Sequence, residues 1–331
     1  MADYEKIIQI LKNHDAFKGD IRKDEPLAPK TTFKVGGHAE LFIAPENYYS
    51  FQIAIETLLI NNIPFIILGG GSNIVISDDG IKGVVISTQA FNDAEIFPPG
   101  DCPKEFGKIE LNKNQVLVTC FSGTPMASLI NFCIEKNFSG LEQFAGLPGT
   151  VGGAVYMNAR CFDKSISDIL FSVSYMDYSN GKVILKKDRY DSSRWAYKKS
   201  PYQNNKTFIT TITFLLTRKK ESEKSLIQSE CKKYINERVS KGHFKYPSAG
   251  SVFKNNHEFG KPSGQIIDEA GLKGYTIGGA KIADFHGNFI INFNKASSKD
   301  IEQLVSYTID TVQKKFGFIL EPEIIFSDKL L

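Results

Sequence analysis

The chain has 331 residues, of which 42% are hydrophobic and 23% charged, and its formal net charge is +3. This balance excludes a disordered protein and is typical of two or three globular domains, which fold without disulfides or metal. Lysine and arginine are scattered in short runs such as Arg218-Lys219-Lys220, so we expect solvated faces and no nucleic-acid partner.

The first part of the chain alternates helical and strand patterns. Apolar spacing predicts helices at residues 4–14 and 47–62, and short apolar runs predict strands at residues 39–44, 63–68 and 83–88. We expect irregular segments at residues 18–30, which contain Pro26 and Pro29, and at residues 92–106. A helix, a strand and then a glycine loop indicate α/β units.

The rest of the chain predicts a strand at residues 115–121, a helix at 126–136 and mainly strands over 170–216. A charged helical stretch at residues 221–238 indicates a boundary between domains. Beyond it we expect a turn at 247–251, helices near 265–270 and at 299–316, and strands at 288–293 and 318–326. The last helix opens with Ser297 and Asp300 in capping-box spacing.

The cysteines and the N-terminus indicate where the protein resides. There are five cysteines, an odd number without CxxC spacing: Cys102, Cys120, Cys133, Cys161 and Cys231. This set fits a reducing compartment better than a disulfide framework or a zinc ribbon. No signal peptide or membrane-spanning apolar run is evident, and the histidines lack metal-ligand spacing. We therefore expect a cytoplasmic protein with no membrane segment and no metal.

A glycine loop, Gly69-Gly70-Gly71-Ser72-Asn73, directly follows the strand predicted at residues 63–68. Without side chains, consecutive backbone N–H groups can point into one concavity and bind phosphate. The loop is neither GxGxxG nor GxxxxGK[ST], which disfavours a Rossmann site and a P-loop. A tight turn that needs positive φ is the alternative, and this loop alone leaves both interpretations open.

A second glycine loop changes that balance. Residues 146–154 read Gly-Leu-Pro-Gly-Thr-Val-Gly-Gly-Ala, with four glycines within eight residues. Two such loops, each next to a strand, favour one ligand with a diphosphate and a long body over two unrelated turns.

Two further residues have an ambiguous pattern when each is taken alone. Ser251 follows a glycine and precedes apolar residues, so its hydroxyl either faces a cleft or belongs to an ordinary turn. Glu323 begins an apolar strand pattern, where a carboxylate either faces water or is retained for function.

Together these motifs resemble the UDP-N-acetylenolpyruvoylglucosamine reductase (UDP-N-acetylmuramate dehydrogenase) family. The matching segments occur in the family's order and cover nearly the whole chain from Lys30 onward. They are residues 31–37, 68–73, 140–158, 197–200, 249–255, 268–274, 277–280 and 320–326.

The resemblance implies an α+β fold with an FAD-binding region of the p-cresol methylhydroxylase type. Two α/β subdomains form that region, and a C-terminal α/β substrate-binding domain follows, whose last strand returns to the active site. We assign residues 1–27 to an N-terminal helix and lead-in, 28–218 to the FAD-binding region and 219–331 to the substrate-binding domain.

The resemblance also implies a reaction in the synthesis of peptidoglycan precursors. NADPH reduces non-covalently bound FAD, and hydride then passes to C3 of the enolpyruvyl ether of UDP-N-acetylglucosamine. A proton completes C2, which gives UDP-N-acetylmuramate. We expect this UDP-sugar to be a small-molecule partner of a monomeric enzyme.

The family's residues fall on specific positions of this chain. Ser251 corresponds to the serine that protonates C2, and Glu323 to the glutamate that helps polarise the enol intermediate. The family pattern Tyr-Arg-x-Ser reads Tyr197-Lys198-Lys199-Ser200 here, so Lys198 stands where the guanidinium is expected. Lysine keeps the charge but loses the planar, two-pronged grip on a carboxylate. Arg160, in a second departure from the pattern, is an alternative source of a guanidinium.

Further contacts complete the predicted site. We expect substrate contacts from Tyr197, Asn255 and His286, the last with the UDP diphosphate. FAD contacts are predicted for Gly69, Gly70, Gly71, Ser72, Asn73, Gly123, Pro148, Gly149, Thr150, Gly152, Gly153 and Ala154. Another FAD oxidoreductase of the same superfamily and a flavin-binding protein without catalysis stay open as alternatives, the latter because of Lys198.

Overall fold

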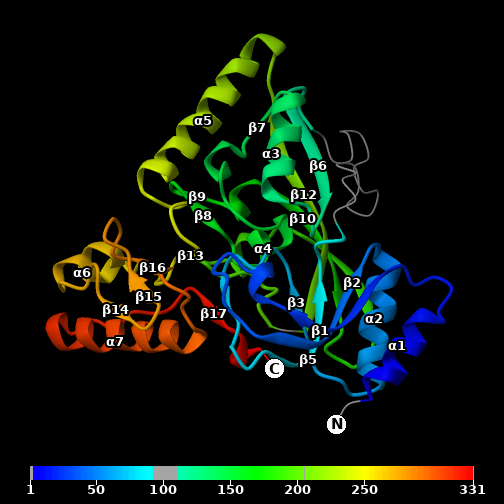
Figure 1. Cartoon of the computed structure of the whole chain (residues 1–331). Coiled ribbons are helices and arrows are strands. Elements are labelled where there is room, and N and C mark those ends of the chain that lie inside the picture. Colours follow the sequence, from blue (N-terminus) through cyan, green and yellow to red (C-terminus); the bar gives the residue numbers. More distant parts are fainter. Residues whose placement is uncertain (1–2, 92–110, 205, 331) are drawn as a thin grey trace. The chain divides into compact units, whose positions relative to one another are not determined.

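The computed structural model describes residues 3–91, 111–204 and 206–330. These residues form two compact units (Figure 1). The first unit is drawn from Met1–Ile21, Ile43–Gly70 and Val85–Asn236, and the second from Arg22–Phe42, Gly71–Val84 and Glu237–Leu331. The domain limits expected from the sequence stay a prediction, and the segment expected to be irregular at 92–106 lies outside the described residues.

An antiparallel sheet organises the first unit, with the strand order β11-β10-β12-β6 and β7 beside the end of β12. Its strands are β6 (Gln115–Phe121), β7 (Phe138–Ser139), β10 (Leu170–Asp177), β11 (Ile184–Arg189) and β12 (Thr207–Arg218). Alternate residues of β12, such as Ile212 and Phe214, are fully buried, which places one face of this sheet in the core. Helices α3 (Met126–Glu135) and α4 (Val151–Tyr156) contribute to the same core.

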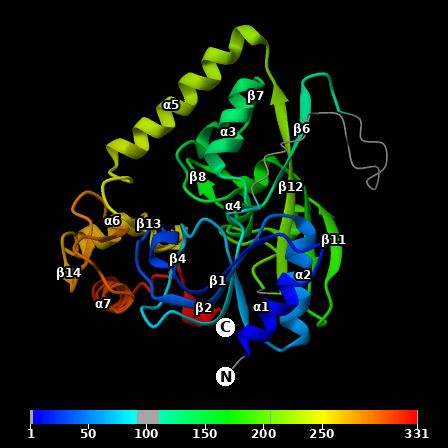
Figure 2. The ribbon, with the colours of Figure 1, turned by 45° about the vertical axis from the view of Figure 1, so that its right-hand side comes forward.

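The helices predicted near the N-terminus are confirmed as α1 (Tyr4–Lys12) and α2 (Tyr48–Ile60), which pack against each other (Figure 2). The side chains of Asp3 and Asn47 cap them by accepting backbone N–H groups of the first turn. In the same unit a short hairpin joins β8 (Arg160–Cys161) to β9 (Lys164–Ser165).

Another sheet has the strand order β1-β2-β5-β3, with β1 at its edge. Its strands are β1 (Gly19–Pro26), β2 (His38–Pro45), β3 (Phe65–Leu68) and β5 (Ile81–Ser87). The prediction of an irregular segment at residues 18–30 is therefore wrong for β1. An edge strand tolerates Pro26 at its end, where no ladder hydrogen bond is required.

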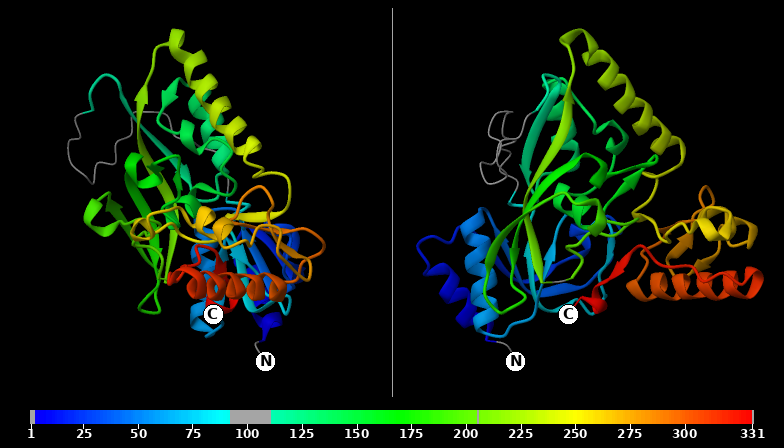
Figure 3. Two further views of the ribbon diagram at one scale, coloured as in Figure 1. Left: turned by 90° about the vertical axis from the view of Figure 1, so that its left-hand side faces the viewer. Right: turned by 180° about the vertical axis from the view of Figure 1, so that it is seen from behind.

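The second unit contains a small antiparallel sheet of order β13-β16-β15-β14. Its strands are β13 (Ser248–Ser251), β14 (Thr276–Ile277), β15 (Ala280–Ile282) and β16 (Phe289–Asn292). Helix α7 (Ser298–Phe316) runs alongside β14 and β15 and contacts α6 (Ser263–Glu269), as Figure 3 shows. The long charged helix predicted before this sheet is α5 (Lys224–Ser240).

Two predictions for this unit are wrong. The segment expected to be a turn at residues 247–251 forms strand β13 from Ser248 onward, with a register shift between Ser248 and Ser251, where Gly250 has a φ of +75°. The segment expected to be a strand at residues 318–326 is a strand only in β17 (Ile325–Phe326), which pairs in parallel with β4 (Ile74–Val75). Before β17 an isolated antiparallel bridge joins Pro322 to Phe253, through the hydrogen bonds of the Lys254 N–H to the Glu321 carbonyl at 2.9 Å and of the Glu323 N–H to the Val252 carbonyl at 2.7 Å.

Three observations concern the described residues alone. No helix among them is long and apolar enough to cross a membrane. They contain no group of three or more His, Cys, Asp or Glu side chains that could hold a metal ion. Their cysteines are buried and free, and they are Cys120, Cys133, Cys161 and Cys231.

The capping box of α7 also ties this helix to the small sheet. The hydroxyl of Ser297 accepts from the Asp300 N–H, and the Asp300 carboxylate accepts from the N–H groups of Ser297 and Gly279 at 3.0 Å each. We expect Asp300→Ala to lower the free energy of unfolding by about 2 kcal/mol, because it removes a helix cap and a long-range hydrogen bond. Urea denaturation measures this loss.

Asp310→Ala, on the exposed face of the same helix, is the matched control and should stay within about 0.5 kcal/mol of the wild type. Equal losses in the two variants would contradict a capping role for Asp300.

Candidate functional site

The two glycine loops of the first unit meet backbone to backbone. A Cβ atom on Gly70 would lie 2.5 Å from the Cα of Gly149, and one on Gly69 would lie 2.9 Å from the Oγ1 of Thr150. The loop after β3 and the loop before α4 can therefore approach this closely only because glycine has no side chain.

A third loop, Ser122-Gly123-Thr124 after β6, joins the same place. A Cβ atom on Gly123 would clash with the carbonyl oxygens of Thr88 and Phe91, and one on Gly152 would lie 2.5 Å from the Cβ of Ser122. The N–H of Gly152 donates to the Ser122 carbonyl at 2.8 Å. We call these converging segments, residues 69–70, 88, 122–124 and 149–153, the glycine cradle.

Three hydroxyl groups of the cradle are buried. Those of Thr88, Ser122 and Thr124 have no hydrogen-bond partner within the described part of the chain, and the Ser172 hydroxyl, outside the cradle, shares this property. A buried hydroxyl without a partner is unusual and costs free energy. The feature of the cradle that suits a diphosphate such as that of FAD is its exclusion of side chains at the glycine positions.

Sequence reasoning named Gly123 but missed the hydroxyl residues Thr88, Ser122 and Thr124. The available signal was the repeated arrangement of a strand followed closely by glycine, which occurs directly after β3 at Gly69 and, with one residue between, after β6 at Gly123. No pattern in the sequence shows that the side chains next to these glycines are buried without partners.

In the second unit, Glu323 lies beside the strand that ends at Ser251. The Glu323 N–H donates to the Val252 carbonyl at 2.7 Å. The side-chain amide of Asn73 donates to the Glu323 carbonyl at 3.0 Å, and the Asn73 carbonyl accepts from the Ile325 N–H at 3.0 Å. The structure thus brings Asn73 and the neighbours of Ser251 to Glu323, although Asn73 and Glu323 are 250 positions apart.

Asn288 fixes the backbone that follows Ser251. Its side-chain oxygen accepts from the Phe253 N–H and its side-chain nitrogen donates to the Phe253 carbonyl, both at 2.8 Å. Its own carbonyl accepts from the Val252 N–H at 2.9 Å. Asn288 is buried and was not predicted as a site residue, because no sequence pattern pairs it with residues 252–253.

The predicted substrate contacts of this unit have defined partners. Asn255 is exposed, and its side chain accepts from the Ser263 N–H at 2.9 Å. His286 accepts the Asn288 N–H on Nδ1 at 3.1 Å, which leaves Nε2 as its donor. Burial, with Lys241 and Lys273 nearby, lowers the pKa of His286 below its ordinary value, so a neutral imidazole is favoured.

Lys198 belongs to the first unit, on the segment between β11 and β12. It is half-buried and holds a φ of +57°, while its neighbour Tyr197 is exposed. Arg160, the alternative cation, is engaged within its own hairpin, where it donates to the Ser165 hydroxyl at 3.3 Å and lies 3.6 Å from the Asp163 carboxylate. The role predicted for Arg160 therefore has no support from its contacts.

Comparisons with known proteins agree with this geometry. A family model described as "FAD binding domain" matches residues 39–185, and one described as "UDP-N-acetylenolpyruvoylglucosamine reductase, C-terminal domain" matches residues 242–327. The chain is 42% identical to the UDP-N-acetylenolpyruvoylglucosamine reductase of Treponema denticola, over 97% of this chain and 98% of that protein. The reductase of Borreliella burgdorferi is 40% identical, over 91% of this chain and 92% of the relative.

A solved structure is also similar over nearly the full length. The crystal structure of the Thermus caldophilus enzyme (MurB) superposes with a TM-score of 0.67 at 30% identity, covering 94% of this chain and 99% of that one. The fold and the glycine cradle define an FAD-dependent oxidoreductase of the α+β class, as predicted. The chain belongs to the UDP-N-acetylenolpyruvoylglucosamine reductase family.

Closure of the cradle depends on Gly70. We expect Gly70→Ala to push the loop away from Gly149 and to weaken FAD binding at least tenfold, which is about 1.4 kcal/mol. The flavin absorbance of the purified protein and a titration of the apoprotein with FAD measure this loss.

Gly181→Ala is the control, because a Cβ atom there meets nothing within 4 Å, and the positive φ of Gly181 adds a backbone strain that Gly70→Ala does not have. It should keep the wild-type affinity for FAD. An unchanged affinity in Gly70→Ala would contradict the role of the cradle.

Proposed function

We propose that this chain catalyses the NADPH-dependent, FAD-mediated reduction of UDP-N-acetylglucosamine enolpyruvate to UDP-N-acetylmuramate, for peptidoglycan precursor synthesis in the cytoplasm. The observation that carries the proposal is the similarity to reductases of that name along 97% of the chain. Matches in both the FAD-binding part and the C-terminal part disfavour a different oxidoreductase of the same superfamily. We further propose that the enzyme acts as a monomer.

The glycine cradle would hold the diphosphate of FAD. Backbone N–H groups of residues 69–70 and 149–150 would donate hydrogen bonds to its oxygens. FAD, when bound, supplies the hydride that it has received from NADPH. The remaining task of the protein is to orient the substrate and to place charge and protons around it.

Addition of hydride to C3 of the enolpyruvyl group moves the electron pair of the double bond toward C2 and the substrate carboxylate. The resulting dianion needs a cation and hydrogen-bond donors that bind it more tightly than the ground state. We assign the cation to Lys198 and the polarising group to Glu323.

Ser251 would donate its hydroxyl proton to C2, which completes the lactyl ether, and would regain a proton from solvent. A hydroxyl can serve as the acid here because the nascent carbanion is strongly basic. Support comes from the backbone on either side of Ser251, where Gly250 leaves open space and Asn288 and Glu323 hold the adjoining residue Val252.

The substrate's UDP group requires its own contacts. We assign the diphosphate to the Nε2 donor of His286, and further substrate contacts to Tyr197 and Asn255. A neutral His286 donates a hydrogen bond to phosphate without carrying a charge in the free enzyme.

The reaction can be tested by following the visible spectrum of the flavin without oxygen. NADPH should bleach the bound flavin, and the enolpyruvyl substrate should then restore its colour and yield UDP-N-acetylmuramate. A yellow protein that NADPH reduces but the substrate does not reoxidise would overturn the proposed function. A colourless protein that does not take up FAD would overturn the cradle as well.

We expect Ser251→Ala to slow the substrate-dependent reoxidation by about 10²- to 10⁴-fold, the usual contribution of a general acid. Reduction by NADPH should keep its rate, because that half of the reaction needs no proton at C2. Stopped-flow absorbance measures both steps. Ser240→Ala, whose exposed hydroxyl donates to the Glu237 carbonyl in helix α5, is the control and should reoxidise normally; equal rates in the two variants would exclude Ser251 as the acid.

We expect Lys198→Ala to slow reoxidation by at least about 10²-fold, because the charge that develops on the substrate carboxylate loses its cation. Lys198→Arg should retain most of the activity, since the charge is preserved. Lys199→Ala, at the exposed neighbouring position, serves as the control. Unchanged turnover in Lys198→Ala would rule out this assignment.

A further inference from the structure

We propose that Gln203 is a positioning residue that holds Lys198 in place for the reduction, with helix α4 as its anchor. This inference rests on the proposed function of Lys198. Residues 190–204, here called the lysine loop, connect β11 to β12 and carry Lys198 within the first unit.

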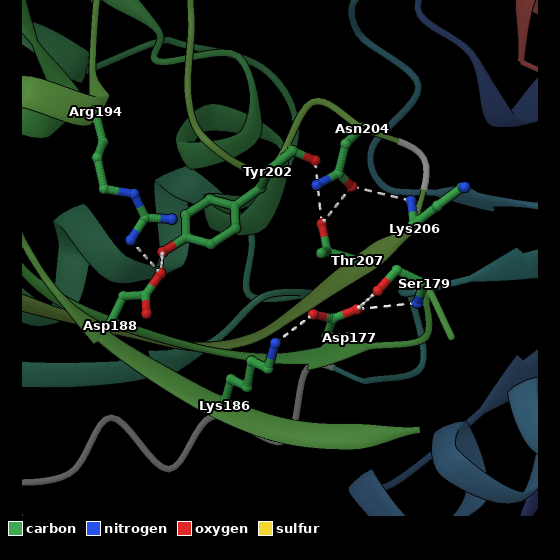
Figure 4. Close-up of polar contacts among 9 residues, drawn as sticks. All are labelled: Asp177, Ser179, Lys186, Asp188, Arg194, Tyr202, Asn204, Lys206 and Thr207. Atoms are coloured by element: carbon green, nitrogen blue, oxygen red, sulfur yellow. Dashed lines mark hydrogen bonds and ion pairs between the residues drawn. The ribbon is translucent and has the colours of Figure 1, made fainter. Parts of the chain in front are cut away.

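The lysine loop is fixed at its base to strand β11. The Asp188 carboxylate pairs with the Arg194 guanidinium at 2.7 Å and accepts from the Tyr202 hydroxyl at 3.4 Å, as Figure 4 shows. The Trp195 ring packs against the rings of Tyr190 and Tyr202, with centroids 5.9 and 6.1 Å away. Both ends of the loop are therefore restrained, and the position of its middle depends on other contacts.

The middle of the loop is bonded to the last residue of α4. The Tyr156 carbonyl accepts from the Ser200 hydroxyl at 2.7 Å and from the Gln203 side-chain nitrogen at 2.8 Å. The same nitrogen of Gln203 donates to the Lys198 carbonyl at 3.2 Å. One side-chain amide thus joins the backbone of Lys198 to the C-terminal end of a helix.

Lys198 needs such a restraint because of its backbone conformation. Its φ of +57° is left-handed, a region that non-glycine residues occupy only when surrounding contacts impose it. An antiparallel bridge between Ala196 and Lys199 closes the tip, and Asn158 donates to the Ala196 carbonyl at 2.8 Å. The hydrogen bond from Gln203 to the Lys198 carbonyl adds a restraint from outside this tip.

Helix α4 connects this anchor to the glycine cradle. The helix is capped by Thr150, whose hydroxyl accepts from the Gly153 N–H at 3.3 Å, and it ends at Tyr156. At 1.5 Å per residue its six residues span about 9 Å, a distance that a hydrogen-bonded turn holds rigidly. The backbone of Lys198 is therefore bonded, through Gln203, to the end of the same short helix that begins in the cradle.

The test replaces Gln203 with methionine, which has a similar length but no N–H donor. We expect Gln203→Met to slow the substrate-dependent reoxidation by about 10- to 100-fold, since small misplacements of a binding group have effects of this size. Flavin content, visible spectrum and the rate of reduction by NADPH should not change. Normal reoxidation in Gln203→Met, alongside slow reoxidation in Lys198→Ala, would overturn this inference and leave the proposed function intact.

A double-mutant cycle separates positioning from a general structural role. If Gln203 acts through Lys198, Gln203→Met should not slow reoxidation further in a protein that already carries Lys198→Ala. If the double variant is instead slowed by the product of the two single effects, Gln203 acts independently and the inference is overturned. If the wild type is not reoxidised, or Lys198→Ala has normal turnover, the proposed role of Lys198 fails and the inference fails with it.

Two further variants complete the design. Gln203→Glu places a carboxylate against the carbonyls of Tyr156 and Lys198. We therefore expect it to slow the substrate-dependent reoxidation more than Gln203→Met does. A smaller effect on this rate would contradict the role of the two hydrogen bonds. Asp177→Asn is the control on the neighbouring strand β10, because Asp177 bonds to Ser179 and Lys186 and not to the lysine loop (Figure 4). It should reoxidise at the wild-type rate.

Discussion

The contact on which the first unit depends is the direct approach of backbone to backbone at Gly70 and Gly149. A single methyl group at Gly70 would fall within 2.5 Å of the facing Cα atom, so this contact tolerates no side chain. Gly123 and Gly152 repeat the constraint on the neighbouring loop. Glycine loses more conformational entropy on folding than other residues, and its concentration here is explained by these close approaches, which exclude every side chain.

Buried hydroxyls lie beside this surface. Those of Thr88, Ser122 and Thr124 have no hydrogen-bond partner within the described residues, a property that they share with the Ser172 hydroxyl outside the cradle. Binding of FAD in the cradle would stabilise the folded state by mass action. The cradle is therefore a place where folding and cofactor binding are linked.

Helix α4 joins the cradle to the lysine loop. Its first turn contributes Gly152 and Gly153 to the cradle, and its last carbonyl receives the side chains of Ser200 and Gln203. One short helix thus joins the cradle to the loop that carries Lys198, the proposed cation. The second unit uses an analogous device, in which Asn288 and Glu323 both bond to the residue after Ser251.

Periodicity and composition were sufficient to predict the helices at residues 4–14, 47–62 and 299–316 and the main strands, because each pattern arises within a few neighbouring residues. The two glycine loops and the C-terminal motif also indicated the family, which the similarity to named reductases confirms. Local patterns failed in two places. The prolines at residues 18–30 predicted an irregular segment where β1 forms, and the apolar residues at 318–324 predicted a strand that does not form. In both places the outcome depends on hydrogen-bond partners that are distant in the sequence.

Only the tertiary structure decided which residues surround the functional groups. Asn73 meets Glu323 across 250 positions, and Gln203 reaches the end of α4 across 47. Such hydrogen bonds join residues that share no period and no motif, since their pairing follows from how strands and loops fold back on one another. The sequence by itself therefore determined the elements, the glycine loops and the family, and the fold alone assigned the side chains that hold Lys198 and the backbone beside Ser251.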